Sequence, residues 1–258
     1  MMKILNKPVA SMHLWAIALL SALAAISSYT LRTFPLPLLI AVAVAAVSET
    51  MLRQFYLKQP FRVPYSGLIT GLIIGSIAPI NSPVLLVIIA VAVAVASKFF
   101  IQYRSSNIFN PAAIGLIVSL ALFRIGDEWW VASNYNIFGV AVTLTPVLVI
   151  LAYEARRLPA ALAFAAVSFI IVLALSGFQN ISSTWFLTAL FGINYYFAFV
   201  MLVEPKTSPN GRNIQIVYGA ALALALFAFT YLRVPYPILV TLLIGNIAYL
   251  LYRASGRR

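Results

Sequence analysis

The chain has 258 residues, of which 63% are hydrophobic and 9% are charged, and its formal net charge is +12. Because soluble proteins carry about 25% charged residues, this composition excludes a soluble catalytic domain and indicates a polytopic membrane protein. The chain has no cysteine, which excludes disulfides, thiolate-bound metals and iron–sulfur clusters. Its one histidine, His13, excludes a histidine-rich metal site and is expected to be solvated beside the first apolar run.

Ten hydrophobic runs follow one another along the chain, separated by short charged or proline-containing connections. In order, they cover residues 12–30, 36–52, 64–80, 83–101, 111–123, 137–153, 158–176, 184–203, 213–231 and 235–251. Runs of this length and composition predict membrane-spanning α-helices. The expected fold class is therefore an all-α polytopic membrane protein with ten transmembrane helices.

The prolines indicate an internal repeat. The sequence APINSP at 78–83 and the sequence EPKTSP at 204–209 share the pattern xPxxSP at an offset of 126 residues, and the same offset relates Pro111 to Pro237. Shifting the first five runs by this offset places them close to the last five. Because five is an odd number, the second copy must enter the membrane inverted. The expected division is a first repeat at 1–124, a short outside connection at 125–136 and a second, inverted repeat at 137–258.

The basic residues predict the orientation of the helices. With the N-terminus in the cytoplasm, only three of the 17 Lys and Arg residues, Arg32, Arg124 and Arg233, fall in outside connections. The others, Lys98 and Arg157 among them, are placed in inside connections, as the positive-inside rule requires. We therefore expect a multi-pass plasma-membrane protein with both termini in the cytoplasm. Its net charge then indicates attraction to anionic lipid, with no soluble basic face for nucleic acid.

Two of the five acidic residues have a functional interpretation. Glu204 closes the eighth run directly before Pro205, where a helix must break and expose backbone carbonyls. A carboxylate beside such carbonyls supplies hard oxygen ligands suited to a proton or Na⁺. Glu49 lies one helical turn before Arg53, so it forms either an interfacial ion pair or part of an ion path. The remaining acids are expected in solvated or interfacial positions: Asp127 and Glu128 in a loop with Trp129 and Trp130, and Glu154 beside Arg156.

Polar residues inside the predicted spans form a second group of candidates. Ser66 and Thr70 lie in the third run, Asn194 lies in the repeat-related eighth run, and Asn246 lies in the tenth. Polar groups at this depth need internal partners or a lined cavity. A single Ser or Thr also serves helix packing, which remains the alternative for these positions.

Three stretches resemble one family of membrane proteins. They are SGLITGL at 66–72, NIFNPAAIG at 107–115 and MLVEPKTSP at 201–209, with IVYG at 216–219, Tyr-Pro at 236–237 and Asn246 as further matches. They resemble the motifs S-A-L-V-T-G-L, H-x-F-N-P-A-x-x-G and L-T-D-P-V-T of the NqrB/RnfD family. Its members are flavin-carrying membrane proteins of the Rnf electron-transport complex and of the Na⁺-translocating NADH:quinone reductase. The resemblance implies an inverted 5+5 helix repeat like that of urea channels, and other membrane or peripheral redox subunits as partners.

The resemblance and the polar positions together define a candidate site. The expected cofactor-binding residues are Ser66, Thr70, Asn110, Gly192, Asn194 and Thr207, and the expected ion-path residues are Glu49, Glu204 and Asn246. Family members carry the threonine esterified to FMN in a long segment between the fifth and sixth spans. Here residues 124–136 contain no threonine, and the family's S-G-A-T in the eighth span reads FGIN at 191–194. We therefore expect no covalent FMN, and a noncovalent flavin (FMN or riboflavin) is left as an option that no motif in the sequence supports.

Three functions fit these observations. The first is a membrane subunit of an Rnf- or Nqr-like electron-transport system, which couples redox chemistry to Na⁺ or H⁺ translocation or holds a noncovalent flavin. In that case the chain is a non-catalytic or flavin-carrying subunit of a membrane oxidoreductase. The second is a stand-alone channel or transporter for a small polar solute, and the third is an assembly scaffold without a ligand. Flavin absorbance of the purified protein would favour the first function, and solute flux in liposomes would favour the second.

Overall fold

The computed structural model describes residues 9–132, 138–175, 190 and 192–256. Its described α-helices are α1 (Val9–Leu31), α2 (Leu36–Met51), α3 (Tyr65–Ile77), α4 (Val84–Phe100), α5 (Pro111–Phe123), α6 (Phe138–Glu154), α7 (Leu158–Leu175), α9 (Arg212–Tyr231) and α10 (Pro237–Ala254). Each coincides with one of the predicted runs to within a few residues, so the mostly helical fold is confirmed. The run predicted at 184–203 is described only from residue 190 onward, where it contains the π-helix η4 (Phe197–Met201).

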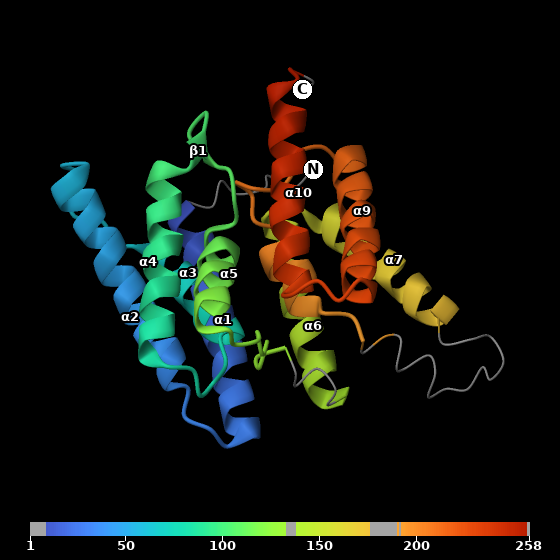
Figure 1. Cartoon of the computed structure of the whole chain (residues 1–258), viewed down its shortest axis with the longest axis horizontal. Coiled ribbons are helices and arrows are strands. Elements are labelled where there is room, and N and C mark those ends of the chain that lie inside the picture. Colours follow the sequence, from blue (N-terminus) through green and yellow to red (C-terminus); the bar gives the residue numbers. More distant parts are fainter. Residues whose placement is uncertain (1–8, 133–137, 176–189, 191, 257–258) are drawn as a thin grey trace, which may run out of the picture.

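The helices stand side by side in two groups (Figure 1). The helices α1 to α5 occupy one side of the molecule and α6, α7, α9 and α10 occupy the other, with α5 and α10 in contact between them. A second π-helix, η1 (Leu52–Tyr56), prolongs α2 beyond the bundle. The sequence did not predict the small hairpin β1 (Gln102–Tyr103) and β2 (Ser106–Asn107), which connects α4 to α5 and projects at the end of the molecule where α10 finishes.

Three glycines on one face of α3 allow it to pack closely against α2. Gly67, Gly71 and Gly75 are spaced four residues apart, so they lie on one stripe of the helix. A Cβ atom added at Gly71 would lie 2.6 Å from the Ala41 carbonyl oxygen, and one added at Gly67 would lie 2.8 Å from that of Ala45. Small residues at this spacing let membrane helices approach at backbone distance, where dispersion replaces the missing hydrophobic effect.

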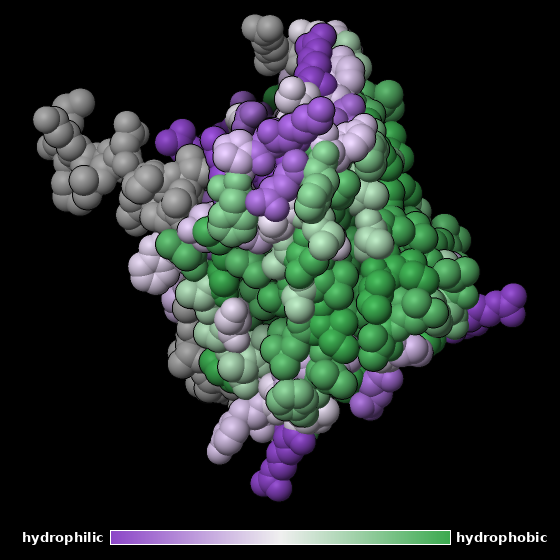
Figure 2. Space-filling view, turned by 90° about the vertical axis from the view of Figure 1, so that its left-hand side faces the viewer, coloured by the Kyte–Doolittle hydropathy of each residue, from purple (hydrophilic) through white to green (hydrophobic). Residues whose placement is uncertain are grey.

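The outer surface of the bundle is apolar around its middle. Figure 2 shows a broad hydrophobic face with hydrophilic residues above and below it. Large exposed hydrophobic side chains occur on many helices, as at Val47 in α2, Leu122 in α5, Ile170 in α7 and Leu224 in α9. Five described helical segments are long and apolar enough to cross a membrane: His13–Leu31, Leu36–Tyr56, Leu158–Leu175, Arg212–Tyr231 and Pro237–Ala254. The helices α3, α4 and α5 are shorter and also apolar.

The connection after α5 corrects one sequence prediction. The tryptophans expected in a solvated loop are largely buried, with Trp129 only 8% and Trp130 only 1% exposed. The indole of Trp130 donates to the Gly75 carbonyl at 2.7 Å, and the Glu128 carboxylate accepts from the Ile80 amide at 2.7 Å. The loop therefore closes the end of α3 and satisfies backbone groups there, which explains why an indole with a polar N–H can be buried.

Candidate functional site

The helix of the eighth run breaks around Glu204, as the following proline predicts. Regular helical structure ends with η4 at Met201 and does not resume until α9 begins at Arg212. Between them, the Glu204 carbonyl accepts hydrogen bonds from the Thr207 amide at 3.2 Å and from the Ser208 amide and hydroxyl at 3.1 and 2.7 Å. The Thr207 hydroxyl donates to the Glu204 carboxylate at 3.2 Å. The break is thus a compact turn that holds the Glu204 side chain.

A buried arginine fixes this turn to the connection between α6 and α7. Arg157 is 5% exposed, and it donates from Nε to the Ser208 hydroxyl at 3.0 Å and from Nη2 to the Pro205 carbonyl at 3.2 Å. It also donates to the side chain of Asn210. Burial lowers the pKa of its guanidinium from the usual value. Arg157 is therefore not the solvated inside-loop cation that the sequence predicted. Its guanidinium carries five N–H donors, so it can satisfy several acceptors of the broken helix at once.

Two asparagines join the two halves of the molecule at the same level. Asn110 caps the N-terminus of α5, where its side chain accepts from the Ala113 amide at 3.0 Å. The Asn246 side chain in α10 accepts from the Asn110 backbone amide at 2.8 Å and donates to the Thr207 carbonyl at 3.2 Å. Asn110 also donates to the Met201 carbonyl at 3.5 Å. Both side chains are buried, so a continuous hydrogen-bonded chain runs from α5 through α10 to the turn of Glu204.

A cavity of about 580 Å³ lies beside these hydrogen-bonded asparagines, between helices of both halves. Its walls come from α1, α3, the start of α5, the end of α6 and the segment from η4 to Lys206. The apolar lining includes Trp15, Ile69, Ile73, Phe199 and Val200. The polar lining consists of His13, Ser66, Thr70, Asn107, Asn110, Glu154, Glu204 and Lys206. An apolar chamber of this size with a few convergent polar groups has the character of a small-molecule or ion site.

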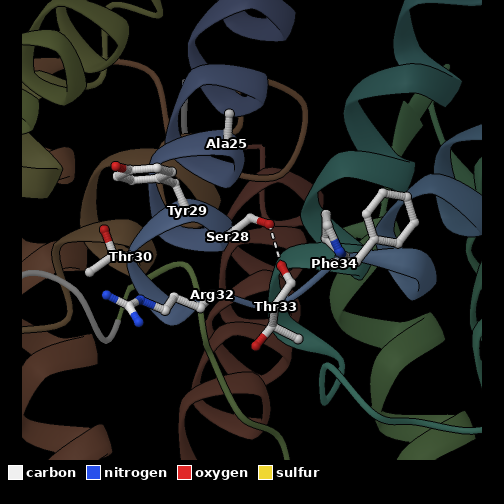
Figure 3. A pocket seen from close by; sticks show the side chains of 8 residues that line it. Ala25, Ser28, Tyr29, Thr30, Arg32, Thr33 and Phe34 are labelled. Atoms are coloured by element: carbon white, nitrogen blue, oxygen red, sulfur yellow. Dashed lines mark hydrogen bonds between the residues drawn. The ribbon is translucent and has the colours of Figure 1, made fainter.

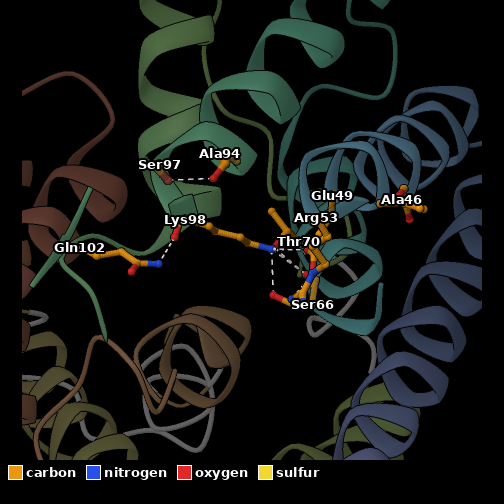
Figure 4. Close-up of polar contacts among 10 residues, drawn as sticks. Ala46, Glu49, Arg53, Ser66, Thr70, Ala94, Ser97, Lys98 and Gln102 are labelled. Atoms are coloured by element: carbon orange, nitrogen blue, oxygen red, sulfur yellow. Dashed lines mark hydrogen bonds and ion pairs between the residues drawn. The ribbon is translucent and has the colours of Figure 1, made fainter. Parts of the chain in front are cut away.

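A buried charge cluster lies directly behind Ser66 (Figure 4). Glu49 is 1% exposed and accepts from Arg53 Nε and Nη2 at 3.0 and 2.8 Å, which is the predicted one-turn ion pair. Lys98 reaches from α4 to the same carboxylate at 3.3 Å and donates to the hydroxyl and the carbonyl of Ser66, both at 2.9 Å. Lys98 is 8% exposed, which corrects its predicted place in an inside loop.

The structure brings most of the predicted site residues together. Ser66, Thr70, Asn110 and Glu204 line the cavity, and Thr207 and Asn246 are hydrogen-bonded to its wall. Glu49 is connected to the cavity only through Lys98 and Ser66. In the described part of the chain, Gly192 and Asn194 do not line the cavity: Gly192 is exposed, and the Asn194 side chain accepts from the Phe197 amide at 2.8 Å and so begins η4.

Sequence reasoning missed several residues of the cavity and its support. His13 and Glu154, which the sequence assigned to ordinary interfacial positions, line the cavity, as do Asn107 and Lys206. Lys98 and Arg157 were assigned to loops, although both stabilise the cavity wall through hydrogen bonds. The repeated proline pattern could have indicated part of this support, because it contains Ser208, which accepts a hydrogen bond from Arg157.

A larger hollow, of about 830 Å³, lies at the turn between α1 and α2 (Figure 3) and contains none of the predicted site residues. Its labelled residues include Ser28, whose hydroxyl donates to the Thr33 carbonyl, and Tyr29, which is 87% exposed. Because such exposed side chains border it, this hollow is open to the surroundings and would not enclose a ligand. The cavity at Glu204 is therefore the candidate site.

Comparison with known protein families identifies the family of the chain. The model of the NQR2, RnfD, RnfE family matches residues 6–147, which is more than half of the chain. The chain belongs to the NQR2, RnfD, RnfE family. No curated protein matches it. The match covers Glu49, Ser66, Thr70 and Asn110 and ends before Glu204, so the second wall of the cavity depends on the structure and on the repeated prolines.

Membership assigns the chain to a general class. The NQR2, RnfD, RnfE family is associated with the membrane subunits of Rnf and Nqr electron-transport complexes. Together with the five long apolar segments, this makes the chain a membrane protein of an electron- and ion-transport family. The resemblance read from SGLITGL and NIFNPAAIG is thereby confirmed.

The first prediction concerns the hydrogen bonds of Asn246, which connect the two halves of the molecule. Replacing Asn246 with leucine leaves the Asn110 amide and the Thr207 carbonyl buried without partners. We expect the free energy of unfolding to fall by about 2–4 kcal/mol, because each such group costs about 1–3 kcal/mol. Unfolding by SDS in mixed micelles would measure it. Thr241→Val on the same helix is the control, since Thr241 bonds only to Pro237 one turn earlier, and an equal loss in both variants would contradict the prediction.

Proposed function

We propose that this protein is the membrane-embedded subunit of an Rnf- or Nqr-like electron-transport system, and that the cavity at Glu204 is where redox chemistry is coupled to movement of Na⁺ or H⁺. The observation that carries the proposal is the convergence of Ser66, Thr70, Asn110 and Glu204, predicted from sequence alone, on one cavity between the two halves. Its partners are then other membrane or peripheral redox subunits, as for the family.

We further propose that the fold is an inverted 5+5 repeat with units at 1–124 and 137–258. The 126-residue offset maps α2, α4 and α5 onto α7, α9 and α10. The packing supports this mapping, because α2 contacts α4 as α7 contacts α9, and α4 contacts α5 as α9 contacts α10. In such repeats the site lies near the interface of the units and is built from interrupted helices, which matches the place of Glu204.

A carboxylate at an interrupted helix suits a monovalent cation or a proton. Glu204 lines the cavity, and the Thr207 hydroxyl hydrogen-bonded to its carboxylate offers a further oxygen. An unpaired carboxylate facing lipid would cost about 2.5–3.5 kcal/mol or more, so its position in a protein-lined chamber is the favourable one. The residues of this ion path are Glu204 and the hydrogen-bonded Asn246, and Glu49 contributes through Lys98.

The chemistry of the cavity also fits a noncovalent flavin. Its volume falls within the range of small-molecule sites, Trp15 and Phe199 offer apolar and aromatic surface, and Ser66, Thr70 and Asn107 offer hydrogen bonds to a polar ring edge. When bound there, a flavin would supply one- and two-electron transfer. The side chains of this chain would hold and orient the ring, and the apolar walls would exclude water from it.

The second prediction is that no FMN is attached covalently. Residues 124–136 lack threonine, and Asn194 replaces the threonine of the eighth-span motif, so neither position offers the threonine that the family esterifies. Intact-mass spectrometry of protein produced together with a flavin transferase should give the bare chain at 28.2 kDa. Any flavin should leave on denaturation, and an added mass of one FMN would contradict the prediction.

A channel or transporter for a small polar solute is the alternative, and the cavity between the two halves also favours it. The two functions differ in a simple measurement. An electron-transport subunit should purify with flavin absorbance or with redox subunits, whereas a stand-alone channel should be colourless and should carry solute across liposome membranes.

A further inference from the structure

The buried cluster behind Ser66 carries more positive than negative charge. Glu49 contributes one negative charge, and Arg53 and Lys98 contribute two positive charges, so the cluster has a net charge of +1. Arg53 already occupies one oxygen of Glu49 with two N–H donors and is 32% exposed, so solvent reaches it. The excess positive charge therefore lies on Lys98, the more deeply buried of the two cations.

Hydrogen bonds hold Lys98 in place without neutralising it. Its ammonium donates to the hydroxyl and the carbonyl of Ser66 at 2.9 Å, and both are uncharged groups. Its distance of 3.3 Å to Glu49 is longer than either distance from Arg53 to the same carboxylate. Because Arg53 shares Glu49, that carboxylate compensates the buried ammonium only in part, and this burial is costly unless a second negative charge also acts on Lys98.

That second negative charge is Glu204. Ser66, which accepts from the Lys98 ammonium, and Glu204 both line the cavity, so the ammonium and the carboxylate lie at the wall of the same chamber. Lys98 comes from the first half of the molecule and Glu204 from the second. The charge of Lys98 therefore offsets that of the cavity carboxylate, whichever ion occupies the cavity.

We infer that Lys98 is a tethered counter-cation of the cavity, which weakens the binding of a free monovalent cation at Glu204 and so sets the cation affinity of the site. This inference depends on the proposed ion path through Glu204. Two positive charges near one carboxylate repel each other, and the repulsion is strong where the dielectric constant is low. Lys98 therefore keeps the affinity low enough for the bound ion to leave, a condition for transport.

The test is equilibrium binding of ²²Na⁺ to the full chain in nanodiscs. Lys98→Met keeps the length of the side chain and removes its charge, so the Na⁺ affinity should rise by about tenfold or more. Lys98→Arg keeps the charge and should bind like the wild type. Adding Glu204→Gln to Lys98→Met should abolish the gain. A purely structural role for Lys98 would lower the affinity, so the direction of the change is decisive.

A second variant keeps the inference testable if Lys98→Met does not fold. Arg53→Met leaves all of the Glu49 charge to Lys98, which weakens the effect of Lys98 on Glu204 and should also raise the Na⁺ affinity. Unchanged or weaker binding in whichever of the two variants folds, or a gain that survives Glu204→Gln, would overturn the inference. If the protein purifies with redox subunits but neither variant gains Na⁺ affinity, only this inference is wrong and the proposed function stands.

Discussion

Replacing Glu49 with glutamine should lower the free energy of unfolding by about 3–5 kcal/mol, because breaking a buried ion pair leaves its partner charge uncompensated. Glu49 is the shared acceptor of Arg53 and Lys98, and its loss leaves a buried ammonium that, in the described part of the chain, is hydrogen-bonded only to the neutral oxygens of Ser66 and has no ion-pair partner in contact. Unfolding in mixed micelles, followed by circular dichroism, would measure the change.

Arg53→Gln is the matched control for this prediction. It removes the other side of the same ion pair, but Arg53 is 32% exposed, and Glu49 keeps its bond to Lys98. The expected loss is therefore about 1 kcal/mol or less. An equal loss of unfolding free energy in the two variants would contradict the prediction, because it would show that the buried charge of Lys98 does not determine the effect of Glu49→Gln.

The second large effect is expected at the contact between α7 and α9. A Cβ atom at Gly219 would overlap the carbonyl oxygen of Ala160 and lie 3.1 Å from the Phe164 amide nitrogen. These are backbone atoms, so the clash cannot be relieved by a side-chain rotation, and α9 must move away from α7. We expect Gly219→Ala to cost about 1–3 kcal/mol, the usual range for overpacking.

Gly126→Ala is the control, because a Cβ atom added at Gly126 would meet nothing within 4 Å. Its effect should stay within about 0.5 kcal/mol. Both variants are compared with the wild type by thermal unfolding in detergent. A Gly219→Ala protein as stable as the wild type would show that α7 and α9 are not packed at backbone distance.

The helices could be predicted from sequence because each is an apolar run between polar connections, although some runs, such as the 13 residues of α5, are shorter than a full span. The contacts between helices left a weaker trace. Gly67, Gly71 and Gly75 follow a spacing that predicts close packing, but nothing in the sequence names α2 as the partner. The hairpin β1–β2 and the π-helices left no pattern, because they depend on how the ends of individual helices pack against neighbouring elements.

The candidate site was predictable where local chemistry decides it. Glu204 was found because a proline must break the helix after it, and Asn110 because it precedes Pro111 in a recognisable motif. Lys98 and Arg157 were misplaced, because a cation at the end of an apolar run looks the same whether its head group reaches solvent or a buried acceptor. Only the fold places Ser66 and Glu49 within reach of Lys98, and Ser208 within reach of Arg157.

Affinity purification of the full chain from native membranes tests the central claim most directly. The eluate is analysed for co-purifying proteins, for flavin released by denaturation and for oxidised-flavin absorbance. The proposed function predicts co-purification with redox subunits of an electron-transport complex, with any flavin on this chain released as a free molecule. A colourless protein that purifies alone and conducts a small polar solute in liposomes would contradict it.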